Sequence, residues 1–203
     1  KGFPSNFGNF YAIAAATLII DFLPMLPLQI LLLNLVSDFP MIAIAADNVD
    51  MEEIKRPKKY DIKDLSLLAA ILGPISTIFD FIFFGLFYKL GAPILQTNWF
   101  IGSTLTELVF PFSLRTKIAF FKAKRPSGIL ICLSIIVGIL TIIIPFTEIG
   151  QTVFKFTPPA TRHLIWIISL VIIYFALTEI VKLFYYRFSD HKNNIEPRRE
   201  KNT

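Results

Sequence analysis

The chain has 203 residues, of which 54% are hydrophobic, and its mean hydropathy is +0.62. Its apolar stretches reach the roughly 18–20 residues that a helix needs to cross a bilayer, which excludes an ordinary soluble domain. The formal net charge is +5, and the basic residues cluster between the apolar stretches, which indicates a membrane surface rather than nucleic acid as the partner.

Six apolar segments follow one another along the chain, each close to the length of one membrane span. They occupy residues 6–23, 26–46, 65–88, 98–114, 128–146 and 162–184. The first two are joined by "DFLPMLP", whose two prolines, Pro24 and Pro27, predict a tight bend. The sequence therefore predicts an all-α integral membrane protein, a six-span helical bundle over residues 1–188. Residues 189–203 are expected to form a disordered cytoplasmic tail.

The charge of the connections predicts the orientation in the membrane. The connections 47–64 and 115–127 and the tail beyond residue 184 carry five basic residues each, whereas the alternate connections carry very few. Because basic loops remain on the cytoplasmic side, these three segments are expected to face the cytoplasm. Six spans then place both chain ends on that side.

The chain begins with Lys1 rather than Met, so we interpret it as a piece of a longer protein. The alternative for the first apolar segment is a signal peptide, because "AIAAA" is similar to a cleavage site. The lone Cys132 can form no intramolecular disulfide, and the sequence has no Cys/His cluster of the kind that binds zinc.

Polar residues inside the second segment predict an ion site. Asn34 and Asp38 are four residues apart and therefore lie on one helix face, with Ser37 beside them. Pro40 weakens the helix nearby and can free backbone carbonyls. These hard oxygen donors suit Mg²⁺, Ca²⁺, Na⁺ or a proton, and they disfavour copper and zinc.

Three further spans contribute polar candidates. In the first span, Asn6 and Asn9 share one helix face, and Gly8 between them allows a close approach by another helix. Asp80 and Glu107 are acids in the middle of the third and fourth spans, where a charge is expensive and usually functional. The alternative for every one of these acids is a satisfied hydrogen bond between helices.

Other polar and aromatic residues receive structural interpretations. Glu179 and Lys182 are three residues apart near the end of the last span, which predicts a structural ion pair at the membrane interface. Trp99 and Trp166 lie near span ends, where tryptophan is typical of interfacial anchoring.

The segment "SNFGN" followed by "LPLQILLLNLVSDFPMIAIAADNVD" resembles the fifth and sixth membrane helices of cation-pumping P-type ATPases. In that superfamily an N-x-x-[ST]-D segment supplies ion ligands, which the resemblance maps to Asn34, Ser37 and Asp38. The entry to the fifth helix supplies more, here Asn6 and Asn9. Calcium pumps have an acid where this chain has Asn9, which argues against a calcium pump that binds two ions.

The runs "DNVDMEEIKRPKKYD", "GPISTIFDF", "WFIGSTLTELVFPFSLRT" and "EIVKLFYYRF" resemble the magnesium-transporting branch. The resemblance implies the fifth to tenth membrane helices of an ATP-driven Mg²⁺ importer of the bacterial inner membrane. The expected ligands are Asp38, Asn34, Asn6 and Asn9, with Asp80 and Glu107 as auxiliary ligands or a countertransport path. An amide is typical of many such importers where this chain has Glu107.

The resemblance also implies partners that these 203 residues do not contain. The phosphorylated Asp-Lys-Thr-Gly segment of the family does not occur in the chain, so it is not expected to hydrolyse ATP alone. The implied partners are lipid, the first four membrane helices and the cytoplasmic domains, with Mg²⁺ as cargo and as the companion of ATP. The alternatives are the same architecture pumping Ca²⁺, Na⁺ or H⁺, and a non-enzymatic membrane subunit.

Overall fold

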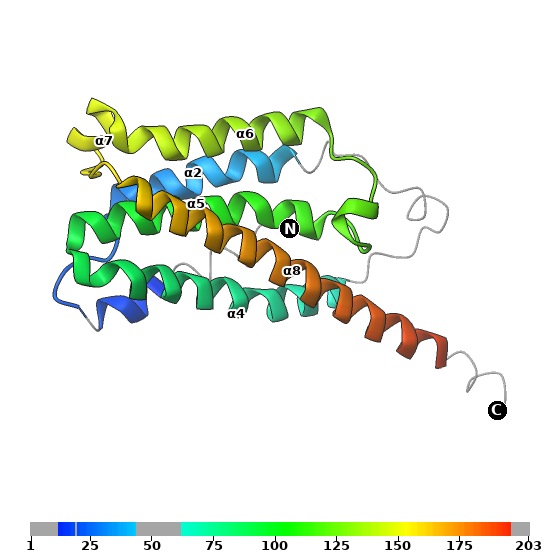
Figure 1. Cartoon of the computed structure of the whole chain (residues 1–203). Helices are drawn as coiled ribbons and strands as arrows, with labels where there is room; N and C mark the ends of the chain where they lie inside the picture. The colour runs from blue at the N-terminus through cyan, green and yellow to red at the C-terminus, as the bar shows by residue number, and fades with distance from the viewer. Residues whose placement is uncertain (1–11, 19, 44–61, 196–203) are drawn as a thin grey trace.

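The computed structural model describes residues 12–18, 20–43 and 62–195, and this part of the chain is helical throughout, without strands (Figure 1). A short helix covers residues 12–17. The longer helices are α2 (Pro27–Ala43), α4 (Ile62–Phe87), α5 (Ala92–Leu114), α6 (Gly128–Ile143) and α8 (Thr161–Ile195), and α7 (Glu148–Thr152) is a short helix between the last two. Short 3₁₀ turns, η2 (Tyr88–Leu90), η3 (Phe120–Lys122) and η4 (Ile144–Phe146), lie in the connections. The expectation of an all-α protein is confirmed for the described residues.

Three segments of the described chain are long and apolar enough to cross a bilayer. They are Ala70–Leu90, Gly128–Phe146 and Thr161–Arg187. The apolar helix α2 is shorter, at 17 residues. A membrane-embedded helical domain is therefore confirmed, while the count of six spans stays a prediction. Helix α8 continues to Ile195, so residues 189–195 are helical although the sequence predicts disorder from residue 189.

The bend before α2 forms where the prolines predict it. Residues 20–26 contain no helix, and α2 begins at Pro27. Proline suits the first helical position because its fixed φ matches the helix and its missing N–H would have no helical partner there. Prolines also lie inside three helices, Pro40 in α2, Pro74 in α4 and Pro111 in α5, and each helix continues past its proline.

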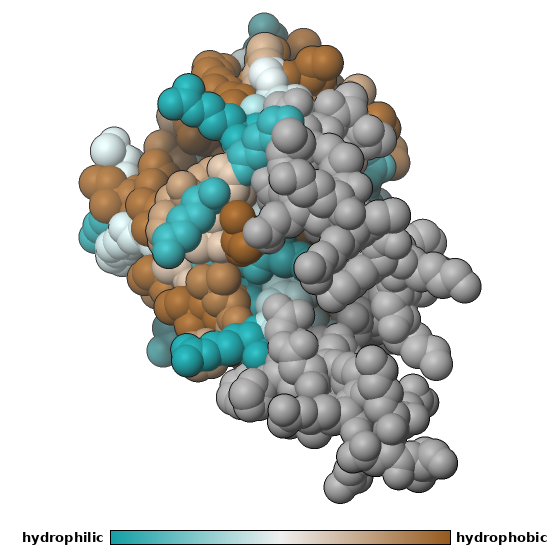
Figure 2. All heavy atoms as spheres, turned by 90° about the vertical axis from the view of Figure 1, so that its right-hand side faces the viewer, coloured by the Kyte–Doolittle hydropathy of each residue, from teal (hydrophilic) through white to brown (hydrophobic). Residues whose placement is uncertain are grey.

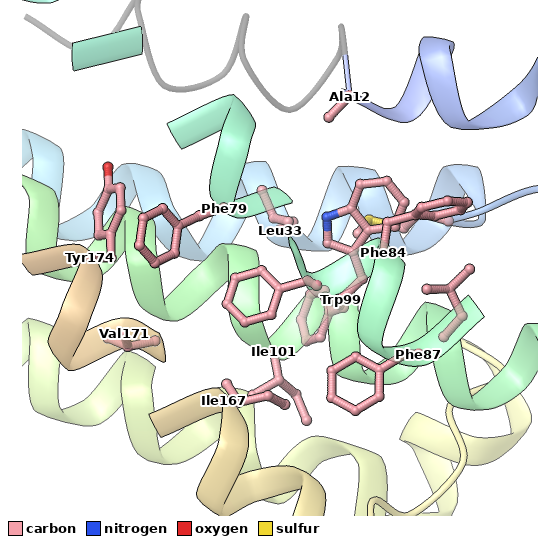
Figure 3. Packing of buried hydrophobic residues seen from close by; sticks show 14 of the residues in the cluster. Ala12, Leu33, Phe79, Phe84, Phe87, Trp99, Ile101, Ile167, Val171 and Tyr174 are labelled. Carbon is pink, nitrogen blue, oxygen red and sulfur yellow. The ribbon is translucent and has the colours of Figure 1, made fainter. Parts of the chain in front are cut away.

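Helix α5 is the centre of the bundle. It packs against α2, α4, α6 and α8, and sixteen of its 23 residues are buried. Many of these are polar, which explains why α5 is less apolar than α4 and α6: the other helices shield it from lipid. In the aromatic core, Trp99 of α5 packs against Phe84 of α4, and Phe87 of α4 and Ile167 of α8 belong to the same cluster (Figure 3).

The outward faces of α6 and α8 carry large apolar side chains. Ile135, Ile139, Ile168 and Ile172 are all exposed on the surface of the described chain. Because lipid tails solvate such side chains as well as a protein core does, an apolar exterior is the expected surface of a membrane bundle.

The two ends of the bundle differ in charge. The connection 115–127 lies at the end opposite to α7 and to the bend before α2 (Figure 1). Lys117, Lys122, Lys124 and Arg125 of this connection are exposed, and hydrophilic side chains gather at this end between apolar surfaces (Figure 2). One end of the described bundle is therefore strongly basic.

At the opposite end, Gly150 of α7 has no room for a side chain. A Cβ atom would collide with the carbonyl oxygen of Ile144, and the carbonyl carbon would be 2.7 Å away. Gly150→Ala should therefore lower the free energy of unfolding by about 3 kcal/mol, since backbone atoms must shift. Thermal unfolding of the full-length protein in detergent measures this. Gly85→Ala is the control, because a Cβ there meets nothing within 4 Å and an alanine favours the helix.

Candidate ion-binding site

Ser37 and Asp38, the two polar residues that follow Asn34 in α2, lie on different faces of this helix. Ser37 is buried, and its hydroxyl donates to the carbonyl of Asn34 at 3.3 Å. Asn34 is half-buried, whereas Asp38 is exposed. Successive side chains in a helix are about 100° apart, so Ser37 can face the bundle while Asp38 faces outward. The carboxylate and the amide still share one side of α2, at a spacing of one turn.

Asp38 lies on an otherwise apolar face of α2. Leu31, Leu35, Phe39 and Ile42 are exposed on the same face, and each is more than one-third accessible. The opposite face, with Leu33 and Ser37, is buried, and α2 packs against α5 and α6. A carboxylate among lipid-facing leucines would cost several kcal/mol, so this position needs a compensating partner.

Pro40 interrupts the hydrogen bonding of α2 next to Asp38. Proline has no N–H, so the carbonyl four residues earlier, that of Val36, loses its helical donor. The segment from Asn34 to Pro40 therefore offers an amide, a hydroxyl, a carboxylate and a backbone carbonyl, all of them oxygen donors that suit a hard cation.

Asp80 of α4 lies deep in the bundle and is 2% exposed. Its Oδ1 accepts hydrogen bonds from Trp99 Nε1 at 3.0 Å and from Ser103 Oγ at 2.6 Å. Its Oδ2 is buried and has no hydrogen-bond partner among the described residues. Both donors belong to α5, so Asp80 joins α4 to α5 at the depth of the core.

The interpretation of Trp99 as an interfacial anchor is wrong. Trp99 is buried against Phe84 in the core, because α5 begins at Ala92 and the tryptophan lies two turns inside the helix. Its indole N–H needs a partner there and finds Asp80. Trp166 is partly exposed near the start of α8, with Arg162 over its ring at 5.3 Å.

Trp99→Phe should lower the free energy of unfolding by about 2 kcal/mol, because it removes one of two donors to a buried carboxyl group. Thermal unfolding of the full-length protein in detergent measures the loss. Trp166→Phe is the matched control and should change the stability by less than about 0.5 kcal/mol, since Trp166 is partly exposed. Equal losses for the two variants would contradict the assigned role of the bond.

Glu107 of α5 is also buried. The two buried acids Asp80 and Glu107 lie on α4 and α5, whereas Asn34, Ser37 and Asp38 lie on α2. Asn6 and Asn9 fall outside the described residues. Within the described residues, no group of three or more His, Cys, Asp or Glu side chains is arranged to hold a metal ion.

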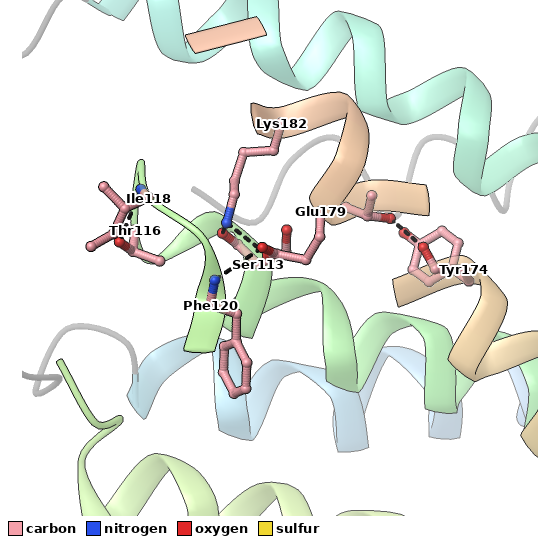
Figure 4. A network of polar contacts seen from close by, with 8 residues as sticks. Ser113, Thr116, Ile118, Phe120, Tyr174, Glu179 and Lys182 are labelled. Atoms are coloured by element: carbon pink, nitrogen blue, oxygen red, sulfur yellow. Dashed lines mark hydrogen bonds and ion pairs between the residues drawn. The ribbon is translucent and has the colours of Figure 1, made fainter. Parts of the chain in front are cut away.

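The predicted pair of Glu179 and Lys182 is confirmed. Lys182 Nζ lies 2.6 Å from Glu179 Oε1 and also donates to the carbonyl of Ser113 at 3.0 Å (Figure 4). Glu179 Oε2 accepts from the backbone N–H of Phe120 at 3.1 Å. The Lys182 side chain is 0% exposed, so the pair is buried rather than solvated. It joins α8 to the end of α5 and to the connection that follows.

Two buried glutamines were missed by the sequence reasoning. Gln29 of α2 and Gln96 of α5 are both buried, and each donates to a backbone carbonyl outside its own helix. Both are uncharged, so they do not stand out in an apolar segment as an acid does, although an uncharged amide inside such a segment also needs a partner.

Comparisons with known proteins agree with this architecture. Residues 22–184 match the family described as "Cation transporting ATPase, C-terminus". Among curated proteins, the chain is similar to "Magnesium-transporting ATPase, P-type 1" of Escherichia coli K12, with 33% identity over 190 residues. The protein of the same name from Salmonella typhimurium LT2 is 32% identical over 190 residues. Each match covers 90% of this chain and 21% of the relative, so the chain spans about a fifth of their length.

Proposed function

Because the chain belongs to the family of cation-transporting ATPase C-terminal regions, we propose that it is the C-terminal membrane domain of an ATP-driven Mg²⁺ importer. The names of the relatives support magnesium as the cargo. In this proposal the domain supplies part of the ion path through the bacterial inner membrane. The hydrolysis of ATP belongs to parts of the pump outside these 203 residues.

The observation that carries this proposal is the position of Asp38. It is a carboxylate on an apolar face of α2, one turn beyond Asn34 and next to the proline at position 40. Such a charge is tolerated in a bilayer when a cation compensates it. Asp38 would attract the dication, and Asn34 and Ser37 would act as neutral oxygen partners. Mg²⁺ keeps several of its waters and needs only one or two carboxylates, which fits a single acid on this helix.

The exposed face of α2 is proposed to be covered in the full-length pump. The residues around Asp38 are apolar, so other membrane helices of the pump would bury them and close the ion site from a second side. Asn6 and Asn9 would supply further amide oxygens. The buried acids Asp80 and Glu107 would serve as auxiliary ligands or as a countertransport path, with Asp80 held by its two donors on α5.

The orientation is proposed from the charge of the two bundle ends. The basic connection 115–127 would lie in the cytoplasm together with both chain ends, as the positive-inside rule predicts for six spans. The end with α7 and the bend before α2 would then face the periplasm.

Uptake into proteoliposomes by the full-length pump tests the cargo. We expect saturable, ATP-dependent movement of Mg²⁺, and no saturable movement of Ca²⁺ or Na⁺ under the same conditions. Transport of Ca²⁺ or Na⁺ with Mg²⁺ serving only as the companion of ATP would replace the proposed cargo and keep the architecture.

A further inference from the structure

Hydrogen bonds from two buried glutamine side chains hold the first turn of α2 and the bend before it. Gln29, which is 0% exposed, donates from Nε2 to the carbonyl of Phe154 at 2.8 Å. Its Oε1 accepts from the backbone N–H of Leu26 at 2.9 Å. Gln96 of α5 donates to the carbonyl of Leu23 at 2.7 Å. The start of α2 is thus tied to α5 and to the connection between α7 and α8.

The connection that receives Gln29 is itself held in place. The backbone N–H of Thr157 donates to Thr97 Oγ1 of α5 at 2.9 Å, and that of Phe156 donates to the carbonyl of Gly150 at 3.0 Å. The ring of Phe156 packs on that of Phe100 at 4.6 Å. Gln29 therefore bonds to a point that is fixed to the central helix.

The rest of α2 has no comparable hydrogen-bonded attachment to the other described residues. Within the described part of the chain, residues 30–43 make one side-chain hydrogen bond, from Ser37 to the carbonyl of Asn34, and it stays inside α2. Pro40 weakens the helix in the same stretch. Helix α2 is therefore held by directional bonds at one end and by apolar packing at the other.

We propose that Gln29 is a positioning residue for the ion site, an inference that rests on the proposed function. By fixing the first turn, it sets the rotation and axial position of α2, and hence where Asn34 and Asp38 present their oxygens. Asn34 lies about 7 Å further along the helix, at about 1.5 Å per residue. A rotation of about 20° would displace a side chain at the helix surface by about 2 Å, which octahedral Mg²⁺ ligation does not tolerate.

Because hydrogen bonds to other parts of the bundle hold only the first turn of α2, the part of the helix beyond that turn is the part that can move. The stretch from Asn34 to Ala43 carries the candidate ligands and Pro40, and it lies beyond the glutamine attachments. Its rearrangement would open or close the ion site while the first turn stays fixed to α5.

Gln29→Met in the full-length pump tests this proposal, since methionine has a similar length and forms neither hydrogen bond. The Mg²⁺ concentration for half-maximal transport should rise about tenfold, while the maximal rate changes less than about twofold. Gln151→Met is the matched control: Gln151 donates to the carbonyl of Pro145 at 3.3 Å at the same end of the bundle, in α7. This control should leave both parameters unchanged.

Hydrogen exchange gives a second readout that does not depend on the cargo. Amides 29–33 should exchange faster in Gln29→Met than in the parent protein, and those of α8 should not change. Unchanged exchange, or faster exchange with unaltered half-saturation by Mg²⁺, would overturn the positioning role. If Gln29→Met does not accumulate, Gln29→Asn carries the same test, because its shorter amide cannot reach Phe154. Failure of the proposed function would appear separately, as movement of Ca²⁺ or Na⁺ rather than Mg²⁺ by the parent pump, and failure of the α2 site would appear as intact Mg²⁺ transport by Asp38→Asn.

Discussion

Asparagine in place of Asp38 should reduce Mg²⁺ transport by the full-length pump about 100-fold or more at low Mg²⁺. The amide keeps the shape of the side chain and one oxygen, but it removes the only acidic charge among residues 30–43. Loss of one partner from a desolvated charge pair costs about 3–5 kcal/mol, and each 1.4 kcal/mol is tenfold in affinity. Uptake of Mg²⁺ into proteoliposomes, measured across a range of concentrations, gives the loss and shows whether it lies in half-saturation.

Asp21→Asn is the matched control for this change. Asp21 is exposed in the bend before α2, and the same substitution there should leave transport within about twofold of the parent. Intact Mg²⁺ uptake by Asp38→Asn would show that the site assignment on α2 is wrong. A loss of Ca²⁺ or Na⁺ transport in place of Mg²⁺ transport would identify another cargo at the same carboxylate.

Lys182→Met should lower the free energy of unfolding by about 3–5 kcal/mol. Lys182 is fully buried and donates both to Glu179 and to the carbonyl of Ser113 in the last turn of α5. Its removal leaves a largely buried carboxylate with the N–H of Phe120 as its remaining donor among the bonds of Figure 4. The penalty for an uncompensated charge then dominates. Thermal unfolding of the purified full-length protein in detergent measures this loss.

The double variant Lys182→Met with Glu179→Gln separates the charge from the packing. It should recover at least half of the lost stability, because glutamine still accepts from Phe120 and no unpaired charge remains. Lys122→Met is the control, since Lys122 is exposed in η3 and should change the stability by less than about 0.5 kcal/mol. A double variant as unstable as Lys182→Met alone would show that the ion pair is not the cause.

Local spacing made several features of this chain predictable. Hydropathy identifies α4, α6 and α8 because their outward faces must be solvated by lipid. The pairing of Glu179 with Lys182 follows from their spacing of three residues in a helix, and the distance of 2.6 Å between Glu179 Oε1 and Lys182 Nζ confirms it. Pro24 lies in the 20–26 bend, and Pro27 starts the next helix. Each of these depends on interactions within about one helical turn or on contact with the solvent.

The role of α5 could not be read in the same way. Its polar side chains make it less apolar than α4 and α6, and the sequence predicts a short span over 98–114, whereas the helix covers Ala92–Leu114. Its surroundings explain this composition: α2, α4, α6 and α8 cover it, and its polar side chains bond to Asp80 of α4, to His163 of α8 and to its own backbone. Trp99 was misread for the same reason, because an aromatic residue near a predicted span end is typical of the interface.

The sequence by itself determined that the chain is helical, that it lies in a membrane, and that the acids inside its apolar segments need partners, because a charge in lipid is costly wherever the residue stands. Only the tertiary structure decided which partners they have. Asp80 accepts hydrogen bonds from Trp99 and Ser103. Lys182 donates to the carbonyl of Ser113, and Gln29 donates to that of Phe154. These partners are 19 to 125 residues apart in the sequence. Hydropathy indicates how much apolar surface a helix must bury, but it does not identify the helices that it packs against. Packing and hydrogen-bond geometry determine those neighbours.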